Sequence, residues 1–139
     1  MPQQFEHEQK SKRHSLVSLA LSIRQRDFSA VEVLDRYARR VAALNPDLNA
    51  IVSLDLDRAL DRGREADEAL ARGECWGPLH GVPFALKDCH EVADFPTTAG
   101  SRLFAGYRPP RDGYVMRRLR SAGGILFGRT NVPELLADF

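Results

Sequence analysis

The sequence predicts an α/β fold in which helices cover a mixed or largely parallel sheet. Stretches with helical spacing alternate along the chain with short apolar runs, an order typical of layered α/β domains. One of these runs, Val82–Lys87, is apolar up to its last residue, as in a strand covered on both faces. The whole chain has 139 residues, which is enough for one domain with a hydrophobic core.

Three helices are expected in the first half of the chain, after a flexible, polar N-terminal tail over residues 1–14. The first begins at Ser15 and ends near Arg26-Asp27. The second begins with Ser29-Ala-Val-Glu32, a capping box in which each side chain binds a free backbone N–H, and ends at Asn45-Pro46. The third spans Asp57–Arg72. Its buried face consists of Ala59, Gly63, Ala66 and Leu70, and Gly73 ends it.

Three strands and two further helix starts complete the predicted elements. Alternating residues predict a short strand over Asp47–Leu54, and Val82–Lys87 and Ile125–Phe127 are predicted as buried strands. A helix over Gly113–Ala122 is expected to have Asp112 as its N-cap and Gly123-Gly124 as its stop. Asn131-Val-Pro-Glu134 is interpreted as one more helix start, with Asn131 as its cap.

The predicted elements make a small sheet for an α/β domain. Two or three strands leave unpaired edges, and parallel strands need cover on both faces. The last predicted helix has shown no stop signal when the sequence reaches Phe139. We therefore expect residues 15–139 to be the leading part of a longer domain.

Composition and charge exclude several classes of protein. Hydrophobic residues make up 43% and charged residues 28%, and the formal net charge is +1, so no strong field attracts nucleic acid or a membrane surface. No leader-like or membrane-spanning apolar stretch is found, which favours a cytoplasmic protein. Cys75 and Cys89 are expected to be reduced thiols.

Lys87 is the main candidate for chemistry, because it ends an apolar strand with a charge. An amine in a fully apolar surround can lose about 3–5 pKa units, which would prepare it to accept a proton from a nucleophile. The alternative is a lysine that ends the strand and extends into water, or that pairs with a carboxylate such as Asp88 or Glu91. The residue pattern alone favours this alternative.

Other clusters are weaker candidates. Thr97, Thr98 and Ser101 lie in a hydroxyl-rich loop that could wrap a polar ligand or form a turn. The grouping of His80, Cys89 and His90 lacks the paired spacing of a metal site, and no metal is predicted. Gly123-Gly124 precedes a strand, the reverse of a dinucleotide site, and the basic run Arg117–Arg120 is interpreted as solvated surface.

Four segments taken together resemble the N-terminal part of the amidase signature family. They are Gly77–Asp88, Pro96–Ser101, Asp112–Leu126 and Gly128–Glu134, and the resemblance extends from about Ser15 to Phe139. The family includes general amidases, fatty-acid and indoleacetamide hydrolases, and the A subunit of the glutamyl-tRNA(Gln) amidotransferase. This chain departs from the family pattern at Cys89-His90 and at Asp94.

The resemblance implies an α/β/α fold with a mixed sheet and a Ser–Ser–Lys mechanism. In the family a lysine accepts a proton, through a bridging serine, from a nucleophilic serine that attacks an amide. Lys87 matches that lysine, and Leu136 and Ala137 match positions that line the acyl pocket in some members. The two serines belong to a Gly/Ser-rich signature that residues 1–139 do not contain.

We therefore expect an amidase that uses no cofactor and acts on a small-molecule amide, with the 139-residue chain inactive on its own. No direct nucleic-acid or membrane partner is expected, and a homodimer is left open. Two alternatives are a non-catalytic remnant or interaction module, and an A-subunit-like component of a tRNA-dependent amidotransferase.

Overall fold

The computed structural model describes residues 15–93 and 95–137. The expected tail over residues 1–14, Asp94 and Phe139 lie outside the described residues. In chain order the elements are α2 (Leu16–Arg24), α3 (Ala30–Leu48), β1 (Ile51–Leu54), α4 (Leu56–Ala71), β2 (Pro83–Lys87), the 3-10 helix η1 (Arg102–Phe104), α5 (Tyr114–Ser121), β3 (Ile125–Thr130) and the 3-10 helix η2 (Glu134–Leu136).

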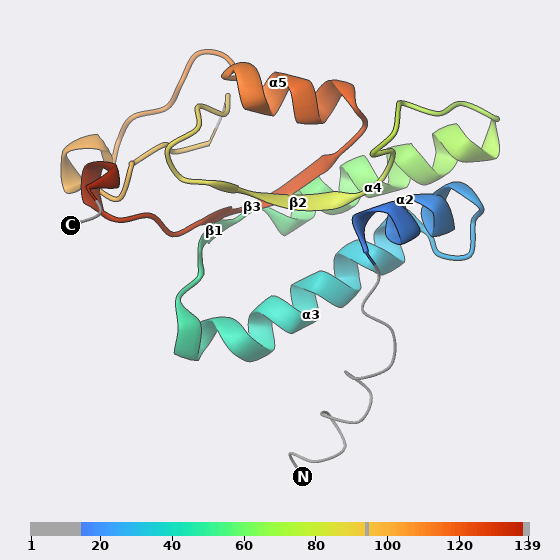
Figure 1. Cartoon of the computed structure of the whole chain (residues 1–139), viewed down its shortest axis with the longest axis horizontal. Coiled ribbons are helices and arrows are strands. Elements are labelled where there is room, and N and C mark those ends of the chain that lie inside the picture. Colours follow the sequence, from blue (N-terminus) through green and yellow to red (C-terminus); the bar gives the residue numbers. More distant parts are fainter. Residues whose placement is uncertain (1–14, 94, 138–139) are drawn as a thin grey trace, which may run out of the picture.

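The three strands form one mixed sheet in the order β1-β3-β2. β3 is the central strand; β1 pairs with it antiparallel and β2 pairs with it parallel. Figure 1 shows α5 on one side of this sheet and α2 and α3 on the other, and α4 packs with α3 against the same face. The predicted α/β class with a mixed, helix-covered sheet is confirmed.

Separate hydrophobic clusters form on the two faces of the sheet. On one face, Ile125 and Phe127 of β3 pack with buried residues of α3 and α4, and Ala85 of β2 borders the same cluster. On the other face, Leu86 of β2 packs with Met116 of α5 and with the buried residues Val92 and Phe95. We call these the α3/α4 face and the α5 face.

Local signals in the sequence explain where the first helices begin and end. The Ser15 hydroxyl accepts a hydrogen bond from the backbone of α2, and Ser29 and Glu32 form both halves of the predicted capping box of α3. In α4, the predicted small-residue face is buried. Gly73 follows with φ +81°, a left-handed conformation that suits glycine.

The predicted end of α3 at Asn45-Pro46 is wrong by about one turn. The helix continues through Pro46 to Leu48, and Asn49 ends it in the left-handed region with its N–H donating to the Asn45 carbonyl at 2.7 Å. A proline so close to the end of a helix removes a single backbone donor and disrupts few later bonds. The strand predicted over Asp47–Leu54 is correspondingly short, and its apolar residues Val52 and Leu54 lie exposed.

β2 has apolar cover on both faces, as its apolar run predicted, because Ala85 borders the α3/α4 cluster and Phe84 and Leu86 belong to the α5 cluster. The burial is only partial: within the described residues β2 is an edge strand, and three of its residues are half-buried. One cap also needs correction. Asp112 does not cap α5, which has Gly113 at its N-cap. The Asp112 carboxylate accepts from the Ala93 N–H at 2.9 Å and from Arg120 at 2.9 Å, so tertiary contacts use the group that capping would need.

Candidate functional site

The carboxyl ends of β2 and β3 bring two chain segments together at one edge of the sheet. Because the two strands run parallel, the chain leaves both of them at the same edge, where α/β folds commonly place their sites. The loop after β2 and the segment after β3 then contact each other. We call residues 87–93, 95–101 and 128–137 the strand-end region.

An irregularity in β3 decides which side chains share a face there. Phe84 pairs with Leu126 and Ala85 with Gly128, so one extra residue of β3 lies opposite β2 between them. After this bulge, Arg129 pairs with Leu86 and therefore shares the α5 face, whereas Thr130 pairs with Lys87. Lys87 and Arg129 thus belong to opposite faces of the sheet.

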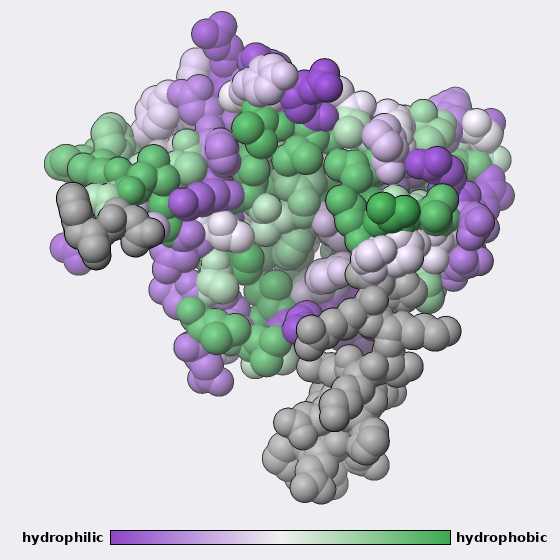
Figure 2. All heavy atoms as spheres, in the orientation of Figure 1, coloured by the Kyte–Doolittle hydropathy of each residue, from purple (hydrophilic) through white to green (hydrophobic). Residues whose placement is uncertain are grey.

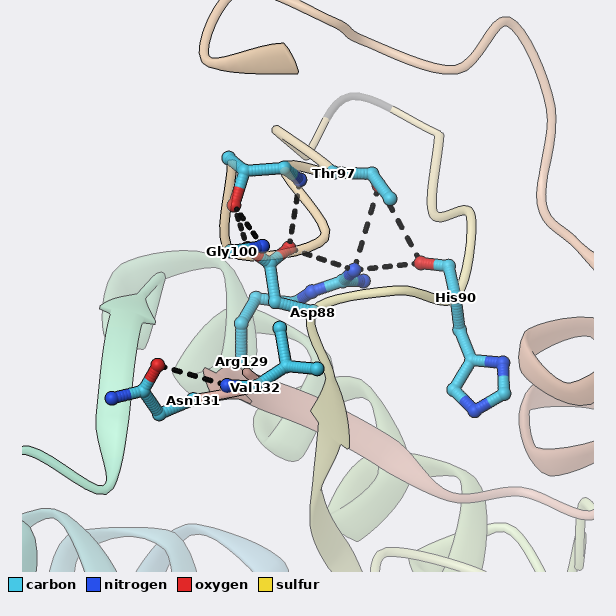
Figure 3. Close-up of polar contacts among 8 residues, drawn as sticks. Asp88, His90, Thr97, Gly100, Arg129, Asn131 and Val132 are labelled. Carbon is cyan, nitrogen blue, oxygen red and sulfur yellow. Dashed lines mark hydrogen bonds and ion pairs between the residues drawn. The ribbon is translucent and has the colours of Figure 1, made fainter. Parts of the chain in front are cut away.

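Arg129 is the centre of a buried polar network (Figure 3). Its side chain is fully buried, and Nη2 lies 3.2 Å from Oδ1 of Asp88, 2.6 Å from the His90 carbonyl and 3.4 Å from the Thr97 hydroxyl. Burial lowers the pKa of the guanidinium from its ordinary value, and the charge of Asp88 together with its hydrogen bond opposes this effect. The ion pair therefore favours the charged form of Arg129.

Asp88 connects this ion pair to the hydroxyl-rich loop. Its carboxylate accepts from the Thr98 N–H at 3.2 Å and from the Thr98 hydroxyl, and its backbone carbonyl accepts from the Ala99 N–H at 2.7 Å. Its own N–H donates to the Thr130 carbonyl at 3.1 Å. A single buried residue thus attaches the loop to the ends of both strands.

The far end of the loop is attached to η2. The Ser101 hydroxyl donates to Oε1 of Glu134 at 3.0 Å, and the Leu135 N–H donates to the Ala99 carbonyl at 2.8 Å. Gly100, with φ +70°, passes so close to the Val132 carbonyl that a Cβ there would lie 2.6 Å from that oxygen. The loop is therefore a structured turn, and its hydroxyls are used in internal hydrogen bonds.

Lys87 ends β2 on the α3/α4 face, and its side chain is exposed. The apolar surround required by the catalytic interpretation is absent from the described part of the chain, because the cluster beneath α3 and α4 reaches Ala85 and stops short of Lys87. The exposure agrees with the alternative that the residue pattern alone favoured, a lysine that extends into water. Within residues 15–93 and 95–137, the amine has no ion pair. Both carboxylates considered as its partners are engaged elsewhere, Asp88 by Arg129 and Glu91 by the Tyr107 hydroxyl.

The histidines and cysteines do not assemble into a site. His80 precedes β2 and is buried, with Nδ1 accepting from the Trp76 N–H at 2.9 Å and Nε2 3.0 Å from the Ala66 carbonyl. Cys89 and His90 follow the opposite end of the strand, and the His90 ring points away from the Arg129 network (Figure 3). Cys75 and Cys89 are free thiols, and the described residues hold no cluster of potential metal ligands.

The helix predicted to begin at Asn131 does not form among the described residues. Oδ1 of Asn131 accepts from the Val132 N–H, Glu134 is bound by Ser101 instead of closing a capping box, and Leu135 has φ +52° inside the short η2. Leu136, at 50% exposure, and Ala137 therefore lie on the surface at the end of this segment. Figure 2 shows hydrophobic surface over η1 and η2.

Sequence reasoning missed Arg129 and considered Asp88 only as one alternative partner for Lys87, which would need a turn directly after the strand. One signal could have indicated the correct arrangement. An isolated glycine inside a strand often marks a bulge, and Gly128 immediately precedes Arg129. A bulge at that point moves the following side chain to the opposite face, which here is the face of Asp88.

Comparisons with known proteins all indicate one family. The sequence profile of the Amidase family matches residues 32–138. The chain is 43% identical over 122 residues to the A subunit of the glutamyl-tRNA(Gln) amidotransferase of Acidothermus cellulolyticus, and 43% identical over 108 residues to the protein of the same name from Chloroflexus aurantiacus. These alignments cover 88% and 78% of the chain but 24% and 22% of the relatives.

Solved structures show the same relation. The native peptide amidase of Stenotrophomonas maltophilia superimposes with a TM-score of 0.81 at 36% identity, and covers 88% of this chain with 25% of its own. A structure titled fatty acid amide hydrolase superimposes with a TM-score of 0.82 at 29% identity, over 86% of this chain and 21% of its own. The chain thus spans about a quarter of the proteins it resembles. None of the helices in its described part combines the length and apolar character that crossing a bilayer requires.

Proposed function

Because the chain belongs to the amidase family, we propose that it supplies the lysine of a Ser–Ser–Lys amide hydrolase. Lys87 is the residue that we assign as the base. One observation supports this assignment above the others: the amine lies at the carboxyl end of a parallel strand, without a carboxylate partner among the described residues. A lysine that is not held in an ion pair gives up its proton more readily.

In the proposed reaction, a serine hydroxyl attacks the amide carbonyl carbon. The hydroxyl proton passes through a second serine to Nζ of Lys87, the C–N bond breaks, and the departing nitrogen takes a proton to leave as ammonia or an amine. Water then cleaves the acyl–serine ester, giving the acid. Residues 1–139 contain no Gly/Ser-rich signature, so both serines would have to come from other residues of the domain.

The need for serines from other residues of the domain would also explain why Lys87 is exposed. A lysine accepts a proton only in its neutral form, which burial favours. We propose that the residues carrying the serines also cover Lys87. Leu136 and Ala137 are proposed to line the acyl pocket in the same assembled domain, where their exposed apolar surface would contact the substrate.

A chimera can test this proposal. Residues 15–137 replace the corresponding quarter of the Stenotrophomonas maltophilia peptide amidase, and release of ammonia from a peptide amide is measured. We expect turnover that Lys87→Met lowers by a factor of about 10²–10⁴, the usual contribution of a general base. Arg102→Met, which removes an exposed cation from the neighbouring η1, is the matched control and should retain turnover.

Two results would contradict the proposal. In the first, the chimera keeps its full rate after Lys87→Met, and the lysine is then not the base. In the second, the 139-residue chain hydrolyses the amide alone and loses that activity on Lys87→Ala, and serines from other residues are then unnecessary.

A second candidate is a component of a tRNA-dependent amidotransferase. It is supported by the identity of 43% to a protein named as the A subunit of the glutamyl-tRNA(Gln) amidotransferase. Co-purification of the protein with a second polypeptide, together with activity that requires that polypeptide, would favour it. The non-catalytic remnant would be favoured by a third outcome. In that case the protein folds, but the chimera hydrolyses no amide and no second polypeptide binds.

A further inference from the structure

Two acidic residues follow Lys87 closely in the sequence, yet among the described residues neither forms an ion pair with its amine. Asp88 is 4% exposed and is held by Arg129 and by Thr98. Glu91 accepts a hydrogen bond from the Tyr107 hydroxyl at 2.7 Å. The segment therefore keeps its carboxylates away from the amine.

Of the two, Asp88 needs the stronger restraint, since it is the immediate neighbour of Lys87. Adjacent residues of a strand point to opposite faces, so Asp88 can reach the amine of Lys87 only through a change in the turn that follows β2. The turn is fixed by hydrogen bonds from the Asp88 N–H to Thr130 and from the His90 N–H to the Lys87 carbonyl, both at 3.1 Å. The Asp88 carboxylate is fixed by the charge of Arg129.

Arg129 occupies a position that ordinary packing would not favour. It is fully buried, and in the described part of the chain its Nε and Nη1 atoms have no hydrogen-bond partner. Burial of an arginine with unpaired donors is costly, so a role beyond packing is a reasonable expectation. The bulge at Gly128 is what places its side chain on the face that Asp88 uses.

We propose that Arg129 is a positioning residue that acts on Lys87 through Asp88. By binding the Asp88 carboxylate on the α5 face of the sheet, Arg129 prevents an ion pair between Asp88 and Lys87 and leaves the amine free to accept a proton. The inference depends on the proposed function for its catalytic meaning. The separation of charges that it describes can be tested without turnover.

The composition of the chain makes this test direct. Its sequence contains three lysines, Lys10, Lys12 and Lys87. Reductive methylation with formaldehyde and cyanoborohydride modifies neutral amines, and the rate at each lysine can be followed by peptide mass spectrometry at low conversion. Lys10 and Lys12 serve as internal standards in the same tube, and Trp76 fluorescence reports whether each variant is folded.

In the Arg129→Met variant, we expect methylation of Lys87 to slow about two- to fivefold against the internal standards, the effect of one partly exposed ion pair. Arg129→Lys keeps a cation beside Asp88 and should retain the wild-type rate. Combining Arg129→Met with Asp88→Asn removes the released carboxylate and should restore that rate. An unchanged rate in folded Arg129→Met, or no recovery in the double variant, would overturn the proposal.

The Asp88→Asn single variant keeps the test decisive if Arg129→Met fails to fold. Since Arg129 already holds the carboxylate away, the rate at Lys87 should stay within a factor of two of wild type. A larger increase would mean that Asp88 acts on Lys87 in the native protein, and the proposal would fail. In an active chimera, Arg129→Met should lower kcat with little change in KM. An inactive chimera would count against the proposed function and leave the methylation result standing.

Discussion

The layer formed by α2, α3 and α4 and the strand-end region are stabilised by different interactions. In the helical layer, buried residues are almost all apolar, and local caps satisfy the helix ends. In the strand-end region, four of the buried side chains are polar or charged: Asp88, Thr97, Ser101 and Arg129. Three of their side-chain contacts join residues that lie 32 to 41 positions apart in the sequence.

This difference indicates how each region tolerates change. Truncating a side chain in an apolar cluster lowers the free energy of unfolding in proportion to the contacts removed, and the neighbouring side chains can partly fill the space. A buried polar network depends on complete pairing, because one missing partner leaves a desolvated group behind. We therefore expect substitutions of similar size to cost more in the strand-end region than in the helical layer.

The largest effect is expected for Arg129→Met. The change removes the cation that pairs with the buried Asp88 carboxylate, and breaking such a pair from one side costs about 3–5 kcal/mol. Urea denaturation followed by Trp76 fluorescence measures the free energy of unfolding. The matched control combines it with Asp88→Asn, which should recover part of the loss. A loss below about 1 kcal/mol would mean that this ion pair contributes no more to stability than an ordinary surface ion pair.

A somewhat smaller loss is expected for Leu34→Ala in the helical layer. Leu34 is fully buried between α3 and α4, and truncation of a buried leucine costs about 2–5 kcal/mol, less where the site can close up. Gly63 faces Leu34 and leaves the surrounding helices little bulk with which to fill the space. Leu16→Ala, at an exposed position of α2, is the control for the same chemical change. If Leu34→Ala costs more than Arg129→Met, the proposed contrast between the regions is reversed.

Gly100→Ala tests the contact between the loop and η2. The φ of +70° strains any residue with a side chain, and the new Cβ would lie 2.6 Å from the Val132 carbonyl oxygen. We expect a loss of about 1–3 kcal/mol, with faster hydrogen exchange at the Ala99 and Leu135 amides. Gly106→Ala is the matched control, because no atom lies within 4 Å of the added carbon. Equal effects of the two changes would show that the loop can move away from η2 freely.

The extent to which the sequence predicted each region follows from the same contrast. The starts of α2 and α3 and the buried face of α4 depend on residues a few positions apart, so their signals lie within short windows. Asp112 and Asn131 carry equally good capping chemistry, but other contacts use their side chains. The Asp112 carboxylate binds the distant Ala93 and Arg120. The Asn131 oxygen accepts from the adjacent Val132 N–H, and its amide nitrogen donates to the distant Asn49 carbonyl. Such competition cannot be predicted from a short window.

The sequence predicted one part of the candidate site and missed another. The position of Lys87 at the end of a strand followed from the apolar run before it, and the structure confirms that position. The exposure of Lys87 agrees with the alternative that the residue pattern favoured, whereas the network behind it depends on the order of the strands and on a bulge in β3. Neither feature has a counterpart in the residues next to Lys87, although Gly128 gave an indirect indication of the bulge.

The smallest effect concerns Glu91, the second carboxylate kept away from Lys87. The Tyr107 hydroxyl donates to Glu91, and this hydrogen bond, with smaller contributions from burial and from the charge of Glu91, raises the pKa of Tyr107 above its ordinary value. The contact therefore stabilises the fold at pH values below the ordinary tyrosine pKa of about 10, and this contribution is lost as the pH rises through the raised value. In Glu91→Gln, the titration of the Tyr107 ring resonance should shift to lower pH. Glu68→Gln, a change at an exposed position of α4, should leave it in place. If Glu91→Gln does not shift the titration, the hydrogen bond is not maintained in solution, and Glu91 would then be available to pair with Lys87.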